Sequence, residues 1–299
     1  MNAPSLTLPL PAPLASPLRY AVVGVLFSLV WSSAFIAGKV GLAVAGPLTL
    51  LSLRFLLAGA LLWVGLLLAG HRLRPVPPVM VLAGLLNNAV YLGLAYSGLA
   101  LVPAALTAIL VCTAPLVTVL LAAAIHGERL TGRAVAGLCL AFASVVTVMG
   151  QRLHVDGLNP WAVGAIALGS LALAVGTLLT RRISGGGDPW STTLAQLLAG
   201  GLALLPLAWA REGLAFEAGS AFYGSLLYQA GPVSIGTTLM LLWLVRHGGA
   251  PRASSFHLLN PFFSIALAVF LLGETLRLLD LACLVPLAAG LTLALHRPR

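Results

Sequence analysis

Long apolar runs, separated by short breaks that contain charges, glycine or proline, make up nearly the whole of this sequence. A helix needs about 20 mainly apolar residues to cross the hydrocarbon core of a bilayer. Divided at these breaks, the chain contains ten runs of that length, so the pattern predicts an all-α integral membrane protein with ten transmembrane helices. The predicted helices lie near residues 20–40, 48–70, 78–98, 102–125, 131–149, 161–180, 190–210, 220–245, 252–272 and 277–295.

Composition supports the membrane class and excludes several others. Of the 299 residues, 60% are hydrophobic and 8% are charged, whereas a soluble domain carries about 25% charged residues. The net charge is +9, but the basic residues stand singly or in pairs between apolar runs, so no nucleic-acid partner is expected. The cysteines lack metal-ligand spacing and no phosphate-binding loop occurs, so we expect neither a metal nor a cofactor.

The basic residues separate by side when the helices are threaded across the membrane in turn. With the N-terminus inside, eleven arginines fall in cytoplasmic loops and tails, and four basic residues fall outside. This excess matches the positive-inside rule, so we expect both termini in the cytoplasm. The eleven are Arg19, Arg72, Arg74, Arg129, Arg133, Arg181, Arg182, Arg246, Arg252, Arg297 and Arg299, and the four are Lys39, Arg152, Arg211 and Arg277.

Two stretches of the chain are rough copies of each other. Ala114-Pro115 is followed by Gly127-Glu128, and 146 residues later Asn260-Pro261 is followed by Gly273-Glu274. An odd number of predicted helices lies within that offset, so the two copies should cross the membrane in opposite directions. Inverted repeats of this kind build the two faces of many transporters.

The repeat sets the expected domain organisation. Residues 1–17 are proline-rich and lack a basic segment, so we expect a mobile extension and not a cleaved signal peptide. Five-helix repeats should then occupy residues 18–150 and, inverted, residues 151–299. A second offset of 142 aligns Gly59 with Gly201, which supports the same pairing of halves.

These residues resemble a known family. A proline within an apolar helix followed by Gly-Glu, twice, is similar to the EamA-type branch of the drug/metabolite transporter superfamily, as is the early Trp31–Phe35 stretch with Gly38-Lys39. Asn260 stands where that family often has alanine. The resemblance implies ten helices in two inverted repeats, location in a bacterial inner membrane, and export of amino acids, especially aromatic and other neutral ones.

The first predicted helix offers candidates for a substrate site. Trp31, Phe35 and Lys39 recur every four residues and therefore share one helix face. Trp31 and Ser32 lie near the centre, where they are candidates for a substrate-binding wall, with helix packing as the alternative. Lys39 lies about two turns further out. It either attracts a substrate carboxylate or extends to the external interface, as long basic side chains do.

The third and eighth predicted helices place polar residues at matching positions. Asn88 and Tyr91 lie three residues apart, and adjacent amides in an apolar helix need partners, so we expect this pair to line a cavity. Ser234 and Thr237 match them through the repeat and are candidates for the same cavity. Tyr96 lies nearer the external interface, where an interfacial aromatic anchor is the ordinary interpretation.

The remaining candidates concern the ninth helix and possible hinges. His257 is interpreted either as a substrate contact or titrating group, or as a donor to a neighbouring carbonyl. Pro115 and Pro261 interrupt corresponding helices, and Pro232 follows a glycine in the eighth, so all three are predicted gating hinges. Arg54, within the second helix, is interpreted first as a structural residue paired with carbonyls or a carboxylate.

Together these observations predict an exporter of a small solute, most of all an amino acid, by alternating access around a central cavity. Its expected partners are the solute and the lipid bilayer, and we expect a monomer. No carboxylate lies within a predicted span, which favours facilitated over proton-coupled transport. The alternatives are another metabolite or drug class, a non-transporting scaffold, or an intramembrane enzyme, whose usual motifs G-x-S-x-G and H-E-x-x-H are absent.

Overall fold

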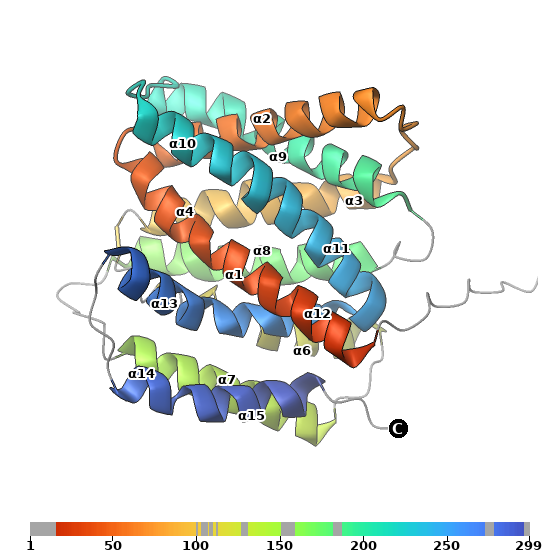
Figure 1. The fold of residues 1–299 in the computed structure, drawn as a ribbon, viewed down its shortest axis with the longest axis vertical. Helices are drawn as coiled ribbons and strands as arrows, with labels where there is room; N and C mark the ends of the chain where they lie inside the picture. The colour runs from red at the N-terminus through yellow and green to blue at the C-terminus, as the bar shows by residue number, and fades with distance from the viewer. Residues whose placement is uncertain are drawn as a thin grey trace, which may run out of the picture.

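The computed structural model describes residues 16–99, 101–102, 107, 110–111, 113–126, 131–150, 159–181, 187–272 and 278–295. In these residues the regular structure is helical, apart from one isolated antiparallel bridge. The helices lie alongside one another in a single bundle (Figure 1). They are α1 (Pro17–Leu42), α2 (Pro47–Leu68), α3 (Pro78–Gly84), η1 (Leu85–Tyr91), α4 (Leu92–Leu99), α6 (Ala114–His126), α7 (Gly132–Gly150), α8 (Pro160–Arg181), α9 (Pro189–Glu212), α10 (Ser220–Tyr228), η2 (Gln229–Gly236), α11 (Thr237–Gly248), α12 (Ala250–Ser255), η3 (Phe256–Leu259), α13 (Asn260–Leu272), α14 (Leu278–Ala282) and α15 (Leu284–Leu295).

The apolar runs of the sequence become long helices. Five stretches of the described chain are long and apolar enough to cross a membrane, namely Pro17–Leu42, Pro47–Leu68, Pro78–Leu99, Pro160–Thr180 and Pro189–Glu212. Proline stands in the first turn of α2, α3 and α9, where its fixed φ suits the helix and its missing N–H removes no bond. The prediction of an all-α membrane protein is therefore confirmed.

Helices α2 and α9 form an antiparallel pair that is joined at both ends. The Glu212 carboxylate, at the end of α9, accepts the Leu48 N–H at 3.0 Å and the Thr49 N–H at 2.8 Å in the first turn of α2. After the other end of α2, His71 Nε2 lies 2.9 Å from the carboxylate of Asp188, the N-cap of α9. Each helix therefore begins where its partner ends.

Glycines let α2 and α9 approach closely between these two ends. A Cβ added to Gly59 would lie 2.5 Å from a Leu198 methyl carbon, and one added to Gly201 would lie 2.8 Å from Leu56 Cγ. The two glycines are those that the offset of 142 aligns. Small residues at helix interfaces allow the backbone contact that drives association in lipid.

Helices α7 and α15 pack against each other at the lower edge of the bundle in the same way (Figure 1). A Cβ on Gly137 would lie 2.5 Å from the Gly290 carbonyl oxygen, and a Cβ on Gly290 would lie 2.5 Å from the Gly137 carbonyl oxygen. Because each glycine faces the backbone of the other, a larger residue at either position would force the helices apart.

The third and eighth predicted helices are observed as continuous helical segments, but their middle parts are not α-helical. A π-helical segment, η1, separates α3 from α4, and a second, η2, separates α10 from α11. Pro232 lies inside η2 and lacks the N–H that a regular helix would use. Asn88 and Tyr91 lie in η1, Ser234 lies in η2, and Thr237 follows directly. The interruptions thus occur at positions that the repeat relates, and π-helical turns often mark functional sites.

The other two predicted hinge prolines begin helical segments. Pro115 is the second residue of α6, and Pro261 is the second residue of α13, directly after the 3₁₀ turn η3. The Pro261 side chain lies outside the described part of the structure. In the first turn of a helix a proline removes little hydrogen bonding, so both mark the points at which straight segments start.

Candidate functional site

Three of the predicted substrate contacts meet in one aromatic cluster inside the bundle. The rings of Trp31 on α1 and Tyr91 on η1 stack, with centroids 6.4 Å apart and planes 10° apart. His257 on η3 meets the Trp31 ring edge-on at 5.1 Å, and Phe27 packs against His257, also at 5.1 Å. Tyr91 and His257 are each 1% exposed, whereas Trp31 is half-buried. The cluster therefore keeps one aromatic surface against which a solute could stack.

The orientation of His257 is fixed by its own helical turn. Asn260 Nδ2 donates to His257 Nδ1 at 3.1 Å, which requires Nδ1 to carry no proton. The alternatives of a substrate contact and a structural donor both remain compatible with this arrangement, because the imidazole packs between Phe27 and Trp31 while Nδ1 is occupied.

Asn88 connects η1 to α9. Its Nδ2 donates to the Gln196 carbonyl at 3.0 Å, and a Cβ on Gly200 would lie 2.5 Å from Asn88 Cβ. Gln196 in turn donates from Nε2 to the Met80 carbonyl at 3.2 Å. The amide of Asn88 thus finds its expected partner on a neighbouring helix, next to a glycine that admits it.

A polar network surrounds Arg54, which is 3% exposed. Arg54 Nε donates to Ser234 Oγ at 2.7 Å and Nη1 donates to Gln229 Oε1 at 3.0 Å. The Tyr96 hydroxyl also donates to Gln229 Oε1 at 3.2 Å, and Gln229 Nε2 donates to Ser225 Oγ at 2.9 Å. An intramembrane cation is costly unless it is hydrogen-bonded. Arg54 therefore fastens the π-helical segment η2 to α2 through neutral groups.

The interpretation of Tyr96 as an interfacial anchor is wrong, because its side chain is 3% exposed. Gln229, which the sequence analysis did not propose as a site residue, is 0% exposed. Helix α1 covers this region, and a Cβ on its Gly38 would lie 3.0 Å from the Tyr96 hydroxyl. Arg54 is the residue of the sequence that could have pointed to Gln229, because a buried guanidinium needs several hydrogen-bond acceptors nearby.

The other predicted site residues are engaged in helix packing or lie outside the description. Ser32 is fully buried, and its hydroxyl lies 2.6 Å from the Ser28 carbonyl and 3.0 Å from the Asn260 carbonyl, which joins α1 to α13. Thr237 is buried and donates to the backbone one turn earlier. The Lys39 side chain lies outside the described part of the structure.

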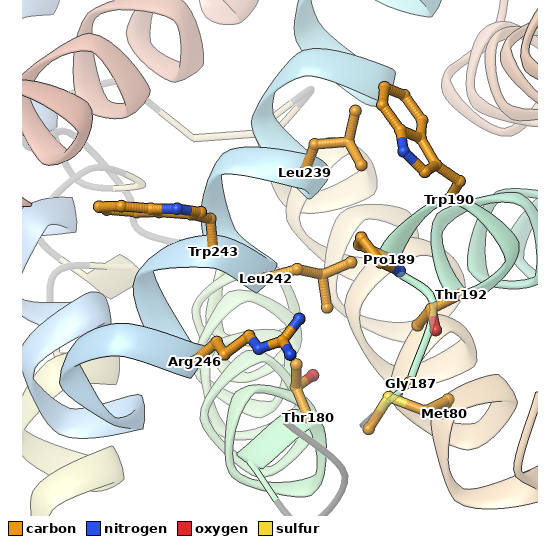
Figure 2. A pocket seen from close by; sticks show the side chains of 10 residues that line it. All are labelled: Met80, Thr180, Gly187, Pro189, Trp190, Thr192, Leu239, Leu242, Trp243 and Arg246. Atoms are coloured by element: carbon orange, nitrogen blue, oxygen red, sulfur yellow. The ribbon is translucent and has the colours of Figure 1, made fainter. Parts of the chain in front are cut away.

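Two cavities open at the end of the bundle where α9 begins and α11 ends, named here the Arg246 end. One has a volume of about 310 Å³ and lies between α3, α8, α9 and α11. The other has a volume of about 680 Å³ and lies beside α2 and the residues that follow it. Trp190 lines both cavities. Figure 2 shows Trp190 and Leu239 at one side of the first cavity and the guanidinium of Arg246 beside Thr180 at the other.

The opposite end, named here the Glu212 end, is held together by backbone and hydroxyl hydrogen bonds. Besides the Glu212 carboxylate on α2, an antiparallel bridge pairs Ala45 with Phe216. Ser225 Oγ on α10 donates to the Ala37 carbonyl on α1 at 2.6 Å. The segment between α1 and α2 is therefore bound to the segment between α9 and α10.

Long apolar helices around a buried polar and aromatic centre form the architecture of a membrane transporter. A sequence profile described as the EamA-like transporter family matches residues 18–150 and again residues 160–295. Because these matches together span most of the chain, the chain belongs to the EamA-like transporter family. The resemblance found in the sequence is confirmed.

Curated relatives match across nearly the whole chain. The chain is 29% identical over 262 residues to the uncharacterized inner membrane transporter YedA of Escherichia coli K12, covering 86% of this chain and 85% of that protein. It is 28% identical over 283 residues to the uncharacterized transporter YvbV of Bacillus subtilis 168, covering 92% and 91%. It is 30% identical over 263 residues to a probable terminal-alkyne amino-acid exporter of Streptantibioticus cattleyicolor, covering 84% of each.

A solved structure has the same fold. It superposes with a TM-score of 0.80 over 93% of this chain and 97% of its own, at 22% sequence identity, and is described only as "Crystal structure of protein". At this identity the likeness concerns the fold.

Proposed function

We propose that this protein exports small solutes from the cytoplasm across a bacterial inner membrane, in particular aromatic and other neutral amino acids. The observation that carries the proposal is the cluster of Trp31, Tyr91 and His257, contributed by three helices. Tyr91 ends η1, one of the two π-helical segments. In a transporter, the solute site is formed by side chains from several helices that can move apart.

The proposed topology is ten transmembrane helices in two inverted five-helix repeats, at residues 18–150 and 151–299. The family profile matches once in each half, which supports this division. The corresponding helices α2 and α9 run antiparallel, as inverted repeats require. Their aligned glycines, Gly59 and Gly201, lie at the same contact.

The proposed orientation places the Arg246 end and both termini in the cytoplasm. The positive-inside rule supports it, because arginines gather at this end. Arg19 and Arg252 lie there over the rings of Trp243 and Tyr20, close to Arg246. The Glu212 end would then face outwards, and the two described cavities would open towards the cytoplasm.

The proposed motion bends the eighth helix at η2 relative to a fixed α2–α9 pair. Bonds at both ends hold α2 and α9 together, so they would move as one body. The segment α10–η2–α11 is joined to this pair by Arg54 in its middle and borders cavities beyond that point. Pro232, inside η2, is the hinge we propose for this bend.

Amino acids are the proposed solute class because the cluster is aromatic and apolar, and because one relative is named as an amino-acid exporter. Another metabolite or drug class is the second candidate, since Trp31 and Tyr91 would stack with any flat apolar solute. We propose facilitated transport by a monomer, without a cofactor and without enzymatic activity.

Flux of radiolabelled L-phenylalanine into proteoliposomes, with and without a pH gradient, tests this proposal. Wild type should exchange phenylalanine across the membrane independently of the gradient. Tyr91→Ala should lower exchange up to about tenfold, because it removes the ring that stacks on Trp31, and such aromatic pairs contribute about 0.5–1.5 kcal/mol. Tyr223→Ala, at a tyrosine that is 50% exposed, is the matched control and should leave exchange unchanged.

Three results would contradict parts of the proposal separately. If well-folded protein moves none of the neutral amino acids, the solute class is wrong. Unchanged exchange in Tyr91→Ala would remove the aromatic cluster from the transport path. A requirement for the pH gradient would replace facilitated transport with proton coupling.

A further inference from the structure

We infer that the 310 Å³ cavity at the Arg246 end is a second binding position, separate from the aromatic cluster, for an amino acid with an apolar side chain. The inference rests on the proposed function, because it takes this end to face the cytoplasm. The cavity would hold the solute before it reaches the centre. Its lining combines one cation, a hydroxyl oxygen and an apolar wall. These groups would bind the carboxylate, the ammonium group and the apolar side chain of an amino acid, respectively.

The carboxylate of the solute would bind to Arg246. Figure 2 shows the Arg246 side chain extending from α11 into the cavity, with its guanidinium between Leu242 and Thr180. In the part of the chain that the structure describes, the one ion pair joins His71 to Asp188, so Arg246 has no carboxylate partner there. A guanidinium presents its donors as a planar fork that fits a carboxylate. Arg246 is an exposed residue, so its guanidinium can be reached from water and would bind the carboxylate at the mouth of the cavity.

The ammonium group would bind to the hydroxyl oxygen of Thr192, which lines the same cavity. Thr192 Oγ1 already donates its hydrogen to the Asp188 carbonyl at 2.8 Å. A hydroxyl whose hydrogen is used offers its oxygen as an acceptor, and an ammonium group is a donor only. Thr192 therefore complements a positive group, while Arg246 binds the anion.

The apolar side chain would lie against the other side of the cavity. Trp190 and Leu239 form that wall, and Leu242 lies between it and Arg246 (Figure 2). The volume lies at the lower limit of the roughly 300–1,000 Å³ typical of small-molecule sites, so a solute of the size of one amino acid fits better than a larger drug. Trp190 also lines the larger neighbouring cavity, which gives the solute a continuous apolar surface.

Protection of a cysteine in the cavity wall measures occupancy without requiring transport. Leu239→Cys would be placed in a protein in which the native cysteines are replaced by alanine, reconstituted in phosphatidylcholine nanodiscs. Its modification by a small thiol reagent should slow about fivefold or more when L-phenylalanine saturates the cavity. L-Phenylalaninamide, which lacks the carboxylate, should protect only at concentrations about tenfold higher, as expected for the loss of charge-assisted hydrogen bonds. The native cysteines are Cys112, Cys139 and Cys283.

The matched variants assign this protection to individual groups. Arg246→Gln should raise the protecting concentration of L-phenylalanine about tenfold and that of the amide less than twofold. Thr192→Val should weaken both ligands, because both carry the ammonium group. Arg133→Gln, at an exposed arginine on α7, is the control and should change neither.

The outcomes separate this inference from the proposed function. Protection without flux would support the cavity site and contradict the exporter proposal. Flux without protection, or equal effects of Arg246→Gln on the acid and the amide, would overturn the cavity site and leave the exporter proposal standing. Protection by added phosphatidylglycerol in place of L-phenylalanine would assign Arg246 to a lipid headgroup and would also overturn the inference.

Discussion

The two ends of the bundle differ in how their helices are joined. At the Glu212 end, the carboxylate of Glu212, the Ala45–Phe216 bridge and the Ser225 hydroxyl bind α1, α2, α9 and α10 to one another. At the Arg246 end, the contact of His71 with Asp188 again joins α2 to α9, and α11 borders the 310 Å³ cavity. The α2–α9 pair is thus joined at both ends, whereas α11 at the Arg246 end is joined to α1, through the Tyr20 hydroxyl, which donates to the Leu244 carbonyl.

Arg54 lies where these two kinds of packing meet. Its donors bind Gln229, the first residue of η2, and Ser234 within it, so the guanidinium holds the π-helical segment against α2. On the Glu212 side of this contact the eighth helix is joined to α1 by the Ser225 hydroxyl, and on the Arg246 side it is joined to α1 by Tyr20 and borders a cavity. Arg54 is the hydrogen-bonded link between α2 and the middle of this helix.

Arg54→Leu should have the largest effect, because it removes both hydrogen bonds that join α2 to η2. A hydrogen bond made by a charged group contributes about 1.5–3 kcal/mol. We expect loss of solute exchange and a lower unfolding temperature, measured by proteoliposome flux and thermal denaturation in detergent. Arg54→Lys keeps the charge but cannot reach both acceptors with one fork, so it should be intermediate. Full activity in Arg54→Leu would show that η2 does not need this anchor.

Glu212→Gln should have the next largest effect, because it weakens the bonds that join α9 to α2 at the Glu212 end. An amide offers one acceptor oxygen where the carboxylate offers two charged ones, and loss of a helix cap costs about 1 kcal/mol. A cysteine at Phe216 should then react about five- to tenfold faster with an impermeant thiol reagent. Glu217→Gln is the control, since Glu217 contacts Val44 through its backbone N–H. Equal rates in the two variants would mean that the Glu212 carboxylate does not hold α9 to α2 at this end.

Asp188→Asn should have the smallest effect, at the other end of the α2–α9 pair. Asp188 lies before α9, outside its apolar segment. Partial burial acts to raise the pKa of the Asp188 carboxyl, but hydrogen bonds from Ser191 and His71 outweigh it and lower the pKa to about 2. A carboxyl whose pKa falls on folding stabilises the fold above its unfolded pKa, near 3.9, and loses that contribution as the pH falls toward 2.

The expected contribution of Asp188 is about 1 kcal/mol, because charges at the water-facing end of the bundle are screened. Asp188→Asn should therefore lower the unfolding temperature by a few degrees at pH 7, and the difference from wild type should shrink between about pH 4 and pH 2. Thermal denaturation across this range measures it. A difference that does not change with pH would contradict the role of the ionised carboxylate.

Much of the fold could be predicted because apolar length dictates where membrane helices lie. The second predicted helix, 48–70, is observed as Pro47–Leu68, and the seventh, 190–210, as Pro189–Glu212. The π-helical segments could not be predicted in this way, since one extra residue in a turn leaves the hydropathy of a span unchanged. Pro232 gave a signal for η2, whereas η1 contains no proline.

Part of the candidate site could be predicted for a similar reason. Trp31, Tyr91 and His257 are conspicuous in apolar helices, and the structure brings them together. Ser32 is beside Trp31 in the sequence, but its hydroxyl contacts α13. The sequence does not reveal which neighbouring helix each side of α1 packs against. Gln229 was overlooked as a site residue for the same reason, since its burial depends on α1 and α2.

The central claim, that the two ends open in turn while α2 and α9 stay together, is tested most directly by spin-label distances. One label pair would join Arg211→Cys on α9 to Tyr223→Cys on α10 at the Glu212 end, and another would join Leu68→Cys on α2 to His247→Cys on α11 at the Arg246 end. Saturating L-phenylalanine should change the two distances in opposite directions. If both distances lengthen together, or neither changes while exchange continues, the two ends do not alternate and the account is wrong.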